Sequence, residues 1–438
     1  MEPRPLLRLV LVGALALCVL PALARDYYVA PDGDDDSPGT LEQPMKSPVT
    51  AARLLKASDS LVFRAGDYNV RANRTYGLAP YADGTAEKPI TFRNHNNEHV
   101  KLDLRGSDWG LTNNGYSYIV FDGLDITNRT HYGMKISAAS GRRAKSGAFV
   151  YGHHVTVRNC DVHHTGGECI FSCGTEYLTI ENCHLHHSTR SHGLYLQVGC
   201  HNAVVRNVTS EHNHGNSGTQ LNAAGGGIKN ALVERCLLRY NAQGWSLMGV
   251  QNSTFRNNIL FNNGYNGPRG SGYREIILWT YGNSKNGRKG TLCENSLFEN
   301  NTIVNLVPKG HKLGRLVQIK SGSRNITFRN NIFYVRGKVV FDIAANAGGG
   351  HVFQNNCLFG GAMVRGAASL EEFAKAKQLK AHGTVAKDPL LVDVEAGNLG
   401  LKPDSPCLKA GTKGTDIGAV PSGDPIQIGC KLPWEKAP

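Results

Sequence analysis

Beyond its first 24 residues the sequence has no long apolar run, so no conventional membrane-spanning helix is expected in the rest of the chain. It also lacks a tract of Lys and Arg or an aromatic-basic motif, so no nucleic-acid-binding module is indicated. Cys169 and Cys173 lie four positions apart, yet no histidine or cysteine follows at the intervals typical of zinc sites. These absences leave a protein without an obvious membrane, nucleic-acid or zinc-finger role.

The first 24 residues have the pattern of a secretory signal peptide. Arg4 and Arg8 precede an apolar run over residues 9–20, and Ala22-Leu23-Ala24 follows as a small-x-small cleavage pattern. We therefore expect a secreted protein, extracellular or periplasmic. Ten of the eleven cysteines lie beyond this segment, and burial or a few disulfide bridges is their expected use.

Acidic residues are scarce relative to basic ones, with 35 Asp and Glu against 48 Lys and Arg, a net charge of +13. Loss of Glu2, Arg4 and Arg8 with the signal peptide changes this to +12. An exported polycation attracts uronic-acid or sulfated glycans, anionic lipid surfaces or extracellular nucleic acid. Charge alone also fits simple solubility with ionic surface attachment.

A short sequence pattern recurs eight times: a strand of alternating apolar and polar residues followed by Asn or, once, by Arg. The steps between corresponding positions are 22 to 30 residues, with one of 43, which is a solenoid period with loop insertions. The corresponding positions are Asn159, Asn182, Asn207, Arg235, Asn257, Asn300, Asn330 and Asn355.

Each unit contains three short strands separated by polar turns, and such coils must stack to pair their backbones. Equivalent residues then lie about 4.8 Å apart, which predicts two vertical columns. The first is an amide ladder of Asn258, Asn301, Asn331 and Asn356, and the second is His164, His187 and His212, continued by Tyr240, Asn262 and Asn305. Cys160 and Cys183 lie in the first column one coil apart, close enough for a disulfide.

The ends of the chain differ from the repeat. A short helix is expected around residues 49–57, and Ser369-Leu370-Glu371-Glu372 is a capping box that opens a second helix reaching about Leu379. Residues 398–419 are expected to form a final partial turn, with Cys407 and Cys430 available to fix it. The expected divisions are a signal peptide (1–24), an N-terminal cap and first coils (25–105), β-helix repeats (106–361) and a C-terminal helix with a closing segment (362–438).

Several stretches resemble secreted pectate-lyase-like β-helix proteins: YYVAPDGDDDSPGTLEQP, LVFRAGDY, SHGLYLQVG, GVQNSTFRNNILFNN and ENNTIVN. The resemblance implies an all-β fold, a right-handed parallel β-helix solenoid. The superfamily includes pectate, alginate and chondroitin lyases, uronate epimerases, glycoside hydrolases and proteins without known activity, so the fold does not name the reaction.

The resemblance also implies that the strand after the third turn belongs to the sheet whose outer face carries a substrate groove. Applied to this chain, it predicts two outward columns on that sheet. They are Tyr195, Gln220, Ser246, Ile277 and Gln318, and beside them Gln197, Asn222, Met248, Trp279 and Lys320.

The turn that leads into this sheet is rich in reactive groups: Glu168, Arg190, His192, His214, Arg269, Arg274, Glu275, Lys312 and Arg315. β-Elimination of a uronate needs cations to hold the carboxylate and a neutral base to remove the C5 proton. Lys320, with its pKa lowered by Arg274 and Arg315, is the predicted base, and His192 is the rival. A solvated strand lysine and a turn-stabilising imidazole are the structural alternatives.

The predicted catalytic residues are therefore Lys320, His192, Arg274 and Arg315, and the predicted substrate-binding residues are Arg190, Tyr195, Gln197, Asn222, Glu275 and Trp279. The metal ligands are unknown. Calcium is a candidate cofactor, although the acidic stretch Asp32 to Asp36 fits a structural turn better. We expect a monomeric polysaccharide lyase that cleaves an acidic polysaccharide by β-elimination and does not bind nucleic acid. The alternatives are a glycoside hydrolase, a uronate epimerase and a non-catalytic glycan-binding protein.

Overall fold

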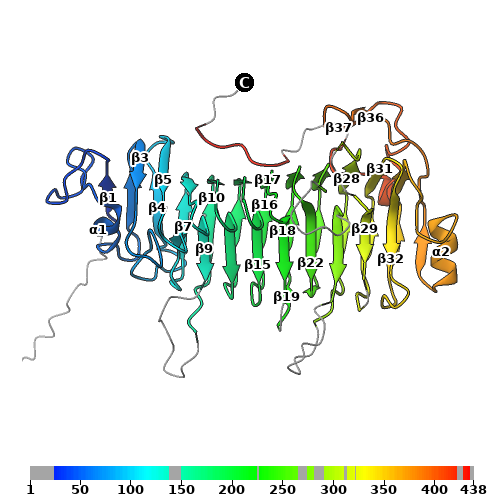
Figure 1. The fold of residues 1–438 in the computed structure, drawn as a ribbon, viewed down its shortest axis with the longest axis horizontal. Coiled ribbons are helices and arrows are strands. Elements are labelled where there is room, and N and C mark those ends of the chain that lie inside the picture. Colours follow the sequence, from blue (N-terminus) through cyan, green and yellow to red (C-terminus); the bar gives the residue numbers. More distant parts are fainter. Residues whose placement is uncertain are drawn as a thin grey trace, which may run out of the picture.

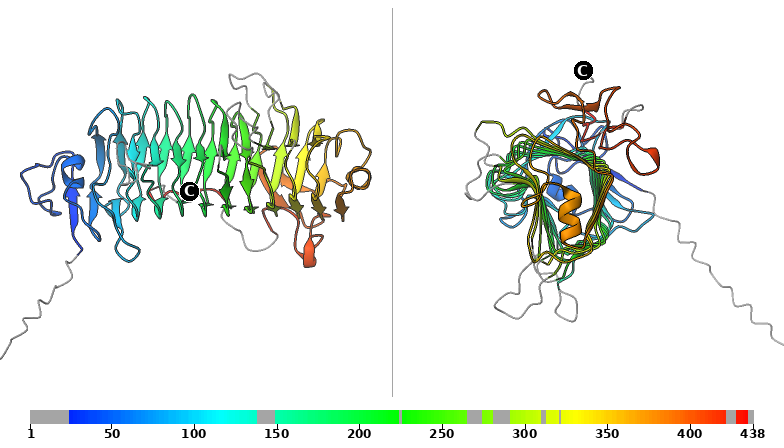
Figure 2. Two further views of the ribbon diagram at one scale, coloured as in Figure 1. Left: turned by 90° about the horizontal axis from the view of Figure 1, so that it is seen from below. Right: turned by 90° about the vertical axis from the view of Figure 1, so that its right-hand side faces the viewer.

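The computed structural model describes residues 24–137, 149–223, 226–264, 274–280, 291–309, 313–320, 322–421 and 428–434. The signal-peptide prediction lies almost wholly outside these residues. Within them the chain winds as a solenoid of three long parallel sheets, shown side-on in Figure 1 and end-on in Figure 2. This is the right-handed parallel β-helix predicted from the sequence.

Sheet A has thirteen strands and lies before the asparagine turn of each coil. Its strands are β1 (Asp26–Val29), β2 (Ser60–Phe63), β4 (Ile90–Asn94), β7 (Ile119–Asp122), β10 (Val155–Arg158), β13 (Thr179–Glu181), β16 (Val204–Arg206), β20 (Leu232–Glu234), β24 (Thr254–Arg256), β27 (Leu297–Glu299), β30 (Thr327–Arg329), β33 (Val352–Gln354) and β35 (Lys380–His382).

Sheet B has eleven strands and follows that turn. Its strands are β3 (Gly66–Asn69), β5 (Val100–Asp103), β8 (Asp125–Thr127), β11 (Asp161–His163), β14 (His184–His186), β17 (Thr209–Glu211), β21 (Leu237–Arg239), β25 (Ile259–Phe261), β28 (Thr302–Asn305), β31 (Ile332–Val335) and β34 (Cys357–Phe359).

Sheet C has nine strands and closes each coil. Its strands are β6 (Leu111–Thr112), β9 (Met134–Ser137), β12 (Ile170–Cys173), β15 (Leu194–Gln197), β18 (Ser217–Asn222), β22 (Gln243–Met248), β26 (Ile276–Trp279), β29 (Arg315–Ile319) and β32 (Val339–Ile343). Two short pairs complete the sheets: parallel β19 (Ile228–Lys229) with β23 (Val250–Gln251), and antiparallel β36 (Leu391–Asp393) with β37 (Asn398–Leu401).

The turn from sheet A to sheet B explains the repeated Asn of the sequence. Asn257, Asn300 and Asn330 all have positive φ, between 50° and 56°, a conformation that Asn tolerates better than most residues. They are stacked in register, because the strands that precede them pair one above another. The alignment on which the site prediction depends is therefore confirmed.

The next residue of each of these turns points inward and forms the predicted amide ladder. Asn258 donates to Asn301 at 2.9 Å, Asn301 donates to Asn331 at 2.9 Å, and Asn331 donates to Asn356 at 2.9 Å. All four side chains are buried. Each side-chain oxygen accepts hydrogen bonds from both the backbone N–H and the side-chain N–H of the Asn one coil before it, so these buried donors have acceptors. Cys160 and Cys183 are buried as free thiols, so the disulfide expected between them is not formed.

The ladder makes a simple stability prediction. Asn301→Ala leaves the backbone and side-chain N–H groups of Asn258 without their acceptor, which costs about 2 kcal/mol of unfolding free energy. Urea denaturation followed by circular dichroism measures this loss. Gln354→Ala, on an outward position of β33, is the control and changes stability little; equal effects of the two substitutions would contradict a role for the ladder.

The two solenoid ends are closed differently. The first helix, α1 (Pro48–Ala52), ends five residues earlier than predicted, because Asp59 accepts from the backbone N–H of Lys56 and turns the chain into β2. The second, α2 (Leu370–Ala376), begins after Ser369, whose hydroxyl accepts from Glu372 N as the capping box predicted. Figure 2 shows α2 lying across the open end of the last coil. No helix in the described ranges is long and apolar enough to span a membrane.

The closing segment is not the partial turn that the sequence suggested. It contains the β36–β37 hairpin and a 3₁₀ turn, η1 (Thr412–Gly414), and it packs outside the coil against sheet B (Figure 1). Apolar side chains from both sides drive this contact, since Phe261, Val304 and Ile332 of sheet B form one buried cluster with Leu391, Leu399 and Ile417. Cys407 belongs to the same cluster as a free thiol.

Candidate functional site

The outer face of sheet C has the register that the sequence predicted. Each strand pairs with the next so that Leu194, Leu196, Leu221 and Leu247 point inward and are buried. The alternate residues therefore face outward. The first outward column reads Tyr195, Gln220, Ser246, Ile277 and Gln318, and the second includes Gln197, Asn222, Met248 and Trp279.

The outward face is not uniformly accessible. In β18 and β22 every residue is buried, including Asn222, which is 8% exposed. Partly accessible groups remain on either side, and they form two patches. The Lys320 patch consists of Arg274, Trp279, Arg315, Lys320 and Asp342. The Lys135 patch consists of Trp109, Tyr132, Lys135, Tyr195 and the nearly buried Phe171.

Lys320 follows β29, and its amine lies over an aromatic ring. Nζ is 5.1 Å from the centroid of Trp279, within the range of a cation–π contact. Burial, followed by the like charges of Arg274 and Arg315, lowers the pKa of Lys320. Loss of solvation is therefore a larger cause than the two arginine charges expected from the sequence. The amine is therefore more readily deprotonated than that of an ordinary lysine.

The two arginines of this patch have different environments. Arg315 Nε lies 3.1 Å from Asp342 Oδ2, and Arg365 Nε lies 3.1 Å from Asp342 Oδ1, so this carboxylate holds two guanidinium groups. Arg274 Nε and Trp279 Nε1 are buried donors that find no acceptor within the described residues. Unsatisfied donors of this kind suit an anionic or hydroxyl-rich ligand.

The Lys135 patch was missed. Lys135 pairs with Phe171 in β12, which pairs with Tyr195, so Lys135 occupies the predicted outward column two coils earlier. Its Nζ lies 3.7 Å from the Trp109 centroid, and burial lowers the pKa of Lys135. The alternation Met134-Lys135-Ile136 indicates that Lys135 faces outward, but the predicted columns began at Tyr195 and Gln197.

Tyr195 and its neighbours form the other side of the Lys135 patch. The Tyr195 hydroxyl accepts from Asn222 Nδ2 at 2.8 Å and lies 3.4 Å from Gln197 Nε2. The ring meets Phe171 edge-on, with 5.4 Å between centroids. The structure thus brings together three of the predicted substrate-binding residues, although Asn222 is almost fully covered.

His192 and Arg190 stabilise the turn before β15. His192 is 4% exposed, and its Nδ1 accepts from the backbone N–H of Ser217 at 3.1 Å. Since this lone pair is in use, the contact favours the turn-stabilising role over that of a base. Arg190 is exposed, but its guanidinium donates to the carbonyls of Gly166 and Thr130, at 2.6 and 3.0 Å.

The prediction that Glu275 binds substrate is wrong, because its side chain points into the interior and is fully buried. Its carboxylate accepts from Asn263 N at 2.8 Å, from Asn263 Nδ2 at 2.7 Å and from Asn305 Nδ2 at 2.6 Å. Burial raises the pKa of Glu275 to about 7 despite these hydrogen bonds. It is the acceptor at the end of a second inner ladder, Asn213, Asn241, Asn263.

Asn305 belongs to this inner ladder and not to the histidine column. That column holds as predicted for His164, His187, His212 and Tyr240, whose rings stack at 4.9, 5.4 and 5.4 Å. Burial, followed by neighbouring imidazoles, lowers the pKa of His187 to about 4, so this ring is neutral at pH 7.

The predicted site residues therefore fall into two groups on one face. Tyr195 and Gln197 lie on β15, and Trp279 and Arg315 lie on β26 and β29, which are three and four rungs away. At about 4.8 Å per rung the groups are on the order of 15–20 Å apart, so one small ligand cannot contact both. Arg269 and Lys312, also predicted for this rim, lie outside the described residues.

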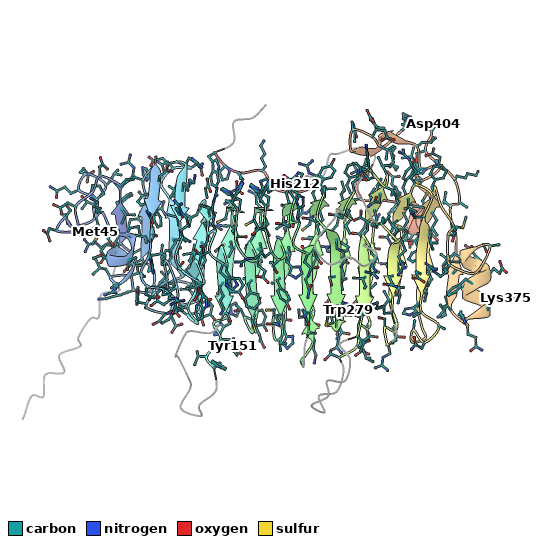
Figure 3. All side chains as sticks on the ribbon, viewed as in Figure 1. Met45, Tyr151, His212, Trp279, Lys375 and Asp404 are labelled. Carbon is teal, nitrogen blue, oxygen red and sulfur yellow. The ribbon has the colours of Figure 1, made fainter. Side chains whose placement is uncertain are left out.

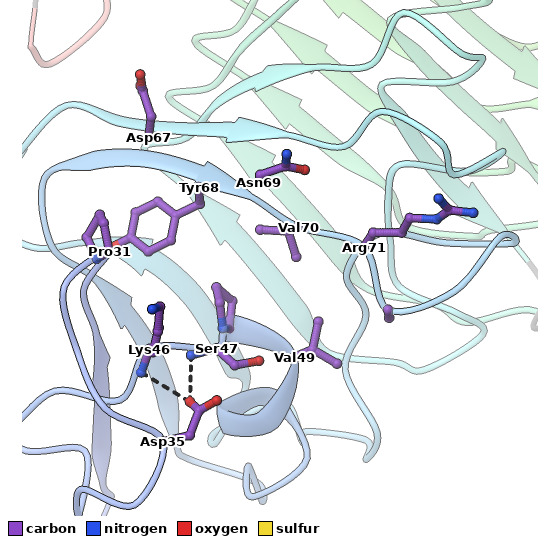
Figure 4. A pocket seen from close by; sticks show the side chains of 12 residues that line it. Pro31, Asp35, Lys46, Ser47, Val49, Asp67, Tyr68, Asn69, Val70 and Arg71 are labelled. Atoms are coloured by element: carbon purple, nitrogen blue, oxygen red, sulfur yellow. Dashed lines mark hydrogen bonds between the residues drawn. The ribbon is translucent and has the colours of Figure 1, made fainter.

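The acidic stretch near the N-terminus has a structural use. Asp35 Oδ1 accepts from the backbone N–H groups of Lys46 and Ser47 at 3.1 and 2.7 Å, and all three residues line the hollow shown in Figure 4. A carboxylate committed to backbone amides in this way fits the structural-turn interpretation. No calcium ligands are assigned on sheet C, and calcium remains a proposal.

Comparison with known proteins agrees with this architecture. A model described as "Pel9A-like, right handed beta helix region" matches residues 27–146, and one described as "Right handed beta helix region" matches residues 122–285. The chain has a right-handed parallel β-helix fold, and its N-terminal part is similar to the Pel9A-like family. Its β-helix is similar to the crystal structure of pectate lyase Pel9A, with a TM-score of 0.57 and 17% identity, covering 91% of this chain and 97% of that one.

Two further relatives show how far the similarity extends. The β-helix aligns with a rhamnogalacturonan lyase structure at a TM-score of 0.54 and 14% identity, covering 87% of this chain and 96% of the other. Pectate lyase PEL9 of Emericella nidulans is 35% identical over 81 residues, which span 18% of this chain and 19% of the relative. The chain thus matches less than a fifth of that curated relative, and the structural similarity establishes the fold alone.

Proposed function

We propose that this β-helix is a polysaccharide lyase that cleaves a uronic-acid polymer by β-elimination at the Lys320 patch. One observation carries the proposal: an amine with a lowered pKa lies beside two guanidinium groups and an indole on the accessible outer face of sheet C. The pectate and rhamnogalacturonan lyases with the same fold support it. Secretion, expected from residues 1–24, is part of the proposal because such polymers are extracellular.

In this mechanism the guanidinium of Arg274, whose Nε has no acceptor within the described residues, binds the uronate carboxylate. Its charge stabilises the carbanionic character that develops at C5. Asp342 holds Arg315 in place beside the amine. Neutral Lys320 removes the C5 proton, the electron pair forms the C4–C5 double bond, and the C4–O bond breaks, releasing the leaving chain. Trp279 packs against a sugar ring.

Hydrolysis fits the described residues less well. A glycosidase requires two carboxyl groups about 5–9.5 Å apart, one of them able to donate a proton. Glu275 is interior, Asp342 is neutralised by two arginines, and Glu168 is buried with Oε1 accepting from Ser191. A uronate epimerase would share the proton abstraction and differ by reprotonating C5 from the opposite face.

The experiment is an incubation of the purified chain with pectate, rhamnogalacturonan, alginate and chondroitin, with and without calcium. Elimination gives an unsaturated uronate, detected by its ultraviolet absorbance. New reducing ends without this absorbance would identify a hydrolase, and a changed uronate stereochemistry without cleavage would identify an epimerase. Salt-sensitive binding with no product on any polymer would refute the lyase proposal and indicate a glycan-binding protein.

A further inference from the structure

A second cluster of reactive side chains lies on sheet B, away from the Lys320 patch. Asp161 of β11 pairs with His184 of β14, and His186 follows two residues later on the same face, while Leu185 between them is buried. In Figure 3 His212, on the sheet B side, lies near the upper edge of the coil and Trp279 near the lower edge. The side chains of Asp161, His184 and His186 are 19%, 20% and 14% exposed.

The three side chains converge on one point. Asp161 Oδ1 lies 3.0 Å from His186 Nε2 and 3.8 Å from His184 Nδ1, and all three ligand atoms lie within 4.8 Å of one another. A tetrahedral ion bound at about 2.0–2.1 Å requires ligand atoms roughly 3.4 Å apart. The two observed distances from Asp161 Oδ1, 3.0 and 3.8 Å, lie on either side of this value. Small side-chain rotations would therefore let all three atoms bind one ion.

Asp161 Oδ1 is also an unsatisfied acceptor. The atom is buried and accepts no hydrogen bond within the described residues, even though His186 Nε2 lies close to it. A buried carboxylate oxygen without a donor is costly, and a bound cation is one way to satisfy it.

The outer nitrogens of both histidines are already occupied, which leaves the inner ones for an ion. His184 Nε2 lies 2.9 Å from Glu211 Oε1, so it carries the proton and Nδ1 has a free lone pair. The Glu211 carboxylate also accepts from Arg239 Nε, which fixes its position beside His184. Carboxylate–histidine pairs of this kind orient the histidine ligands of metal sites.

His186 is oriented in a similar way by a neighbouring imidazole. Its Nδ1 lies 2.6 Å from Nδ1 of His187, which can accept a hydrogen bond from it. Donation in this direction leaves the lone pair of His186 Nε2 directed at Asp161, 3.0 Å away. The two histidines thus present opposite ring nitrogens, each set by its outer partner.

We propose that Asp161, His184 and His186 bind one divalent transition-metal ion of the zinc class, with water in the fourth position. Two imidazoles and one carboxylate suit zinc and its neighbours, whereas calcium prefers an all-oxygen shell. The ion joins two successive rungs of sheet B. The site does not depend on the proposed lyase activity, since it shares no residue with the Lys320 patch.

The neighbouring coil provides a matched control. Asp125 pairs with Asp161 in the same column, but its two oxygens lie 2.7 Å from His163 Nε2 and 2.9 Å from His99 Nε2. Each oxygen therefore already has its own imidazole partner. Asp125→Asn changes the same residue type at the same column without removing a proposed ligand.

Titration calorimetry of the untagged chain with Zn²⁺ tests the proposal. We expect one equivalent to bind, with the affinity lowered at least about 100-fold by Asp161→Asn or His186→Ala and about 10–100-fold by Glu211→Gln. Asp125→Asn and His212→Ala should retain wild-type affinity, and Zn²⁺ should raise the melting temperature only where it binds. Circular dichroism with EDTA confirms that each variant is folded.

Two results would overturn the assignment. Unchanged Zn²⁺ affinity in Asp161→Asn and His186→Ala would show that these side chains are not ligands. Loss of binding in His212→Ala, with Asp161→Asn unaffected, would place the ion in the stacked histidine column instead.

Discussion

Lys320→Ala is expected to lower the rate of unsaturated-product formation from a polyuronate by about 10²–10⁴-fold, the usual contribution of a general base. The amine is the group with a lowered pKa beside Arg274 and Arg315, so its removal leaves the C5 proton without an acceptor. Lys320→Arg should be almost equally inactive, because a guanidinium stays protonated. Initial rates measured by ultraviolet absorbance give the comparison, and polymer-binding affinity should change far less than the rate.

The control for this substitution is Lys338→Ala, which removes an exposed lysine just before β32. It alters the net charge equally and should leave the rate unchanged. The wild-type rate should rise with pH, since the base acts in its neutral form, with a midpoint below that of an ordinary lysine. A Lys320→Ala enzyme with wild-type activity would contradict the assignment and direct attention to Lys135.

Glu275→Gln is expected to remove a pH dependence from the stability of the fold. The pKa of Glu275 is 4.5 as an unperturbed group and about 7 in the buried site, so between these values the folded protein holds a proton that the unfolded chain has lost. The stabilisation that comes from this extra proton is fully present below about pH 4.5 and is lost as the pH rises through about 7. Its loss lowers the free energy of unfolding by about 3 kcal/mol. Glutamine cannot ionise and should show no such change.

The measurement is urea denaturation of both proteins between about pH 4.5 and about pH 8. The difference in unfolding free energy, wild type minus Glu275→Gln, should fall by about 3 kcal/mol over this range, and other titrating groups cancel in the difference. Glu176→Gln, at an exposed position, should give a constant difference. A constant difference for Glu275→Gln would mean that its carboxyl group does not titrate differently in the folded state.

Much of the fold was predictable because a solenoid converts sequence spacing into spatial columns. The αL residues such as Asn257 and Asn300 mark each turn, and the residue after each mark, such as Asn258 or Asn301, joins a ladder. The same two-residue rule applies after the sheet B strands, where His212-Asn213 and Tyr240-Asn241 repeat it. Applying it there would have revealed the second ladder.

The site was predicted less well, for identifiable reasons. The outward columns were correct, since alternation fixes which residues of a strand face solvent. Glu275 immediately precedes β26, where alternation no longer decides direction, and three amide donors draw it inward. Lys135 obeys the same alternation, but it lies two strands before Tyr195, where the predicted column began.

The sequence by itself determined the coil, the register of its strands and the side chains that share each face, because these depend on local alternation and on a nearly constant repeat length. Only the tertiary structure decided which outward residues are accessible, which are covered at β18 and β22, and where the closing segment packs. It also decided the chemistry of Lys320 and Glu275. Burial lowers the pKa of the first and raises that of the second, and the burial comes from strands packed around them in the coil.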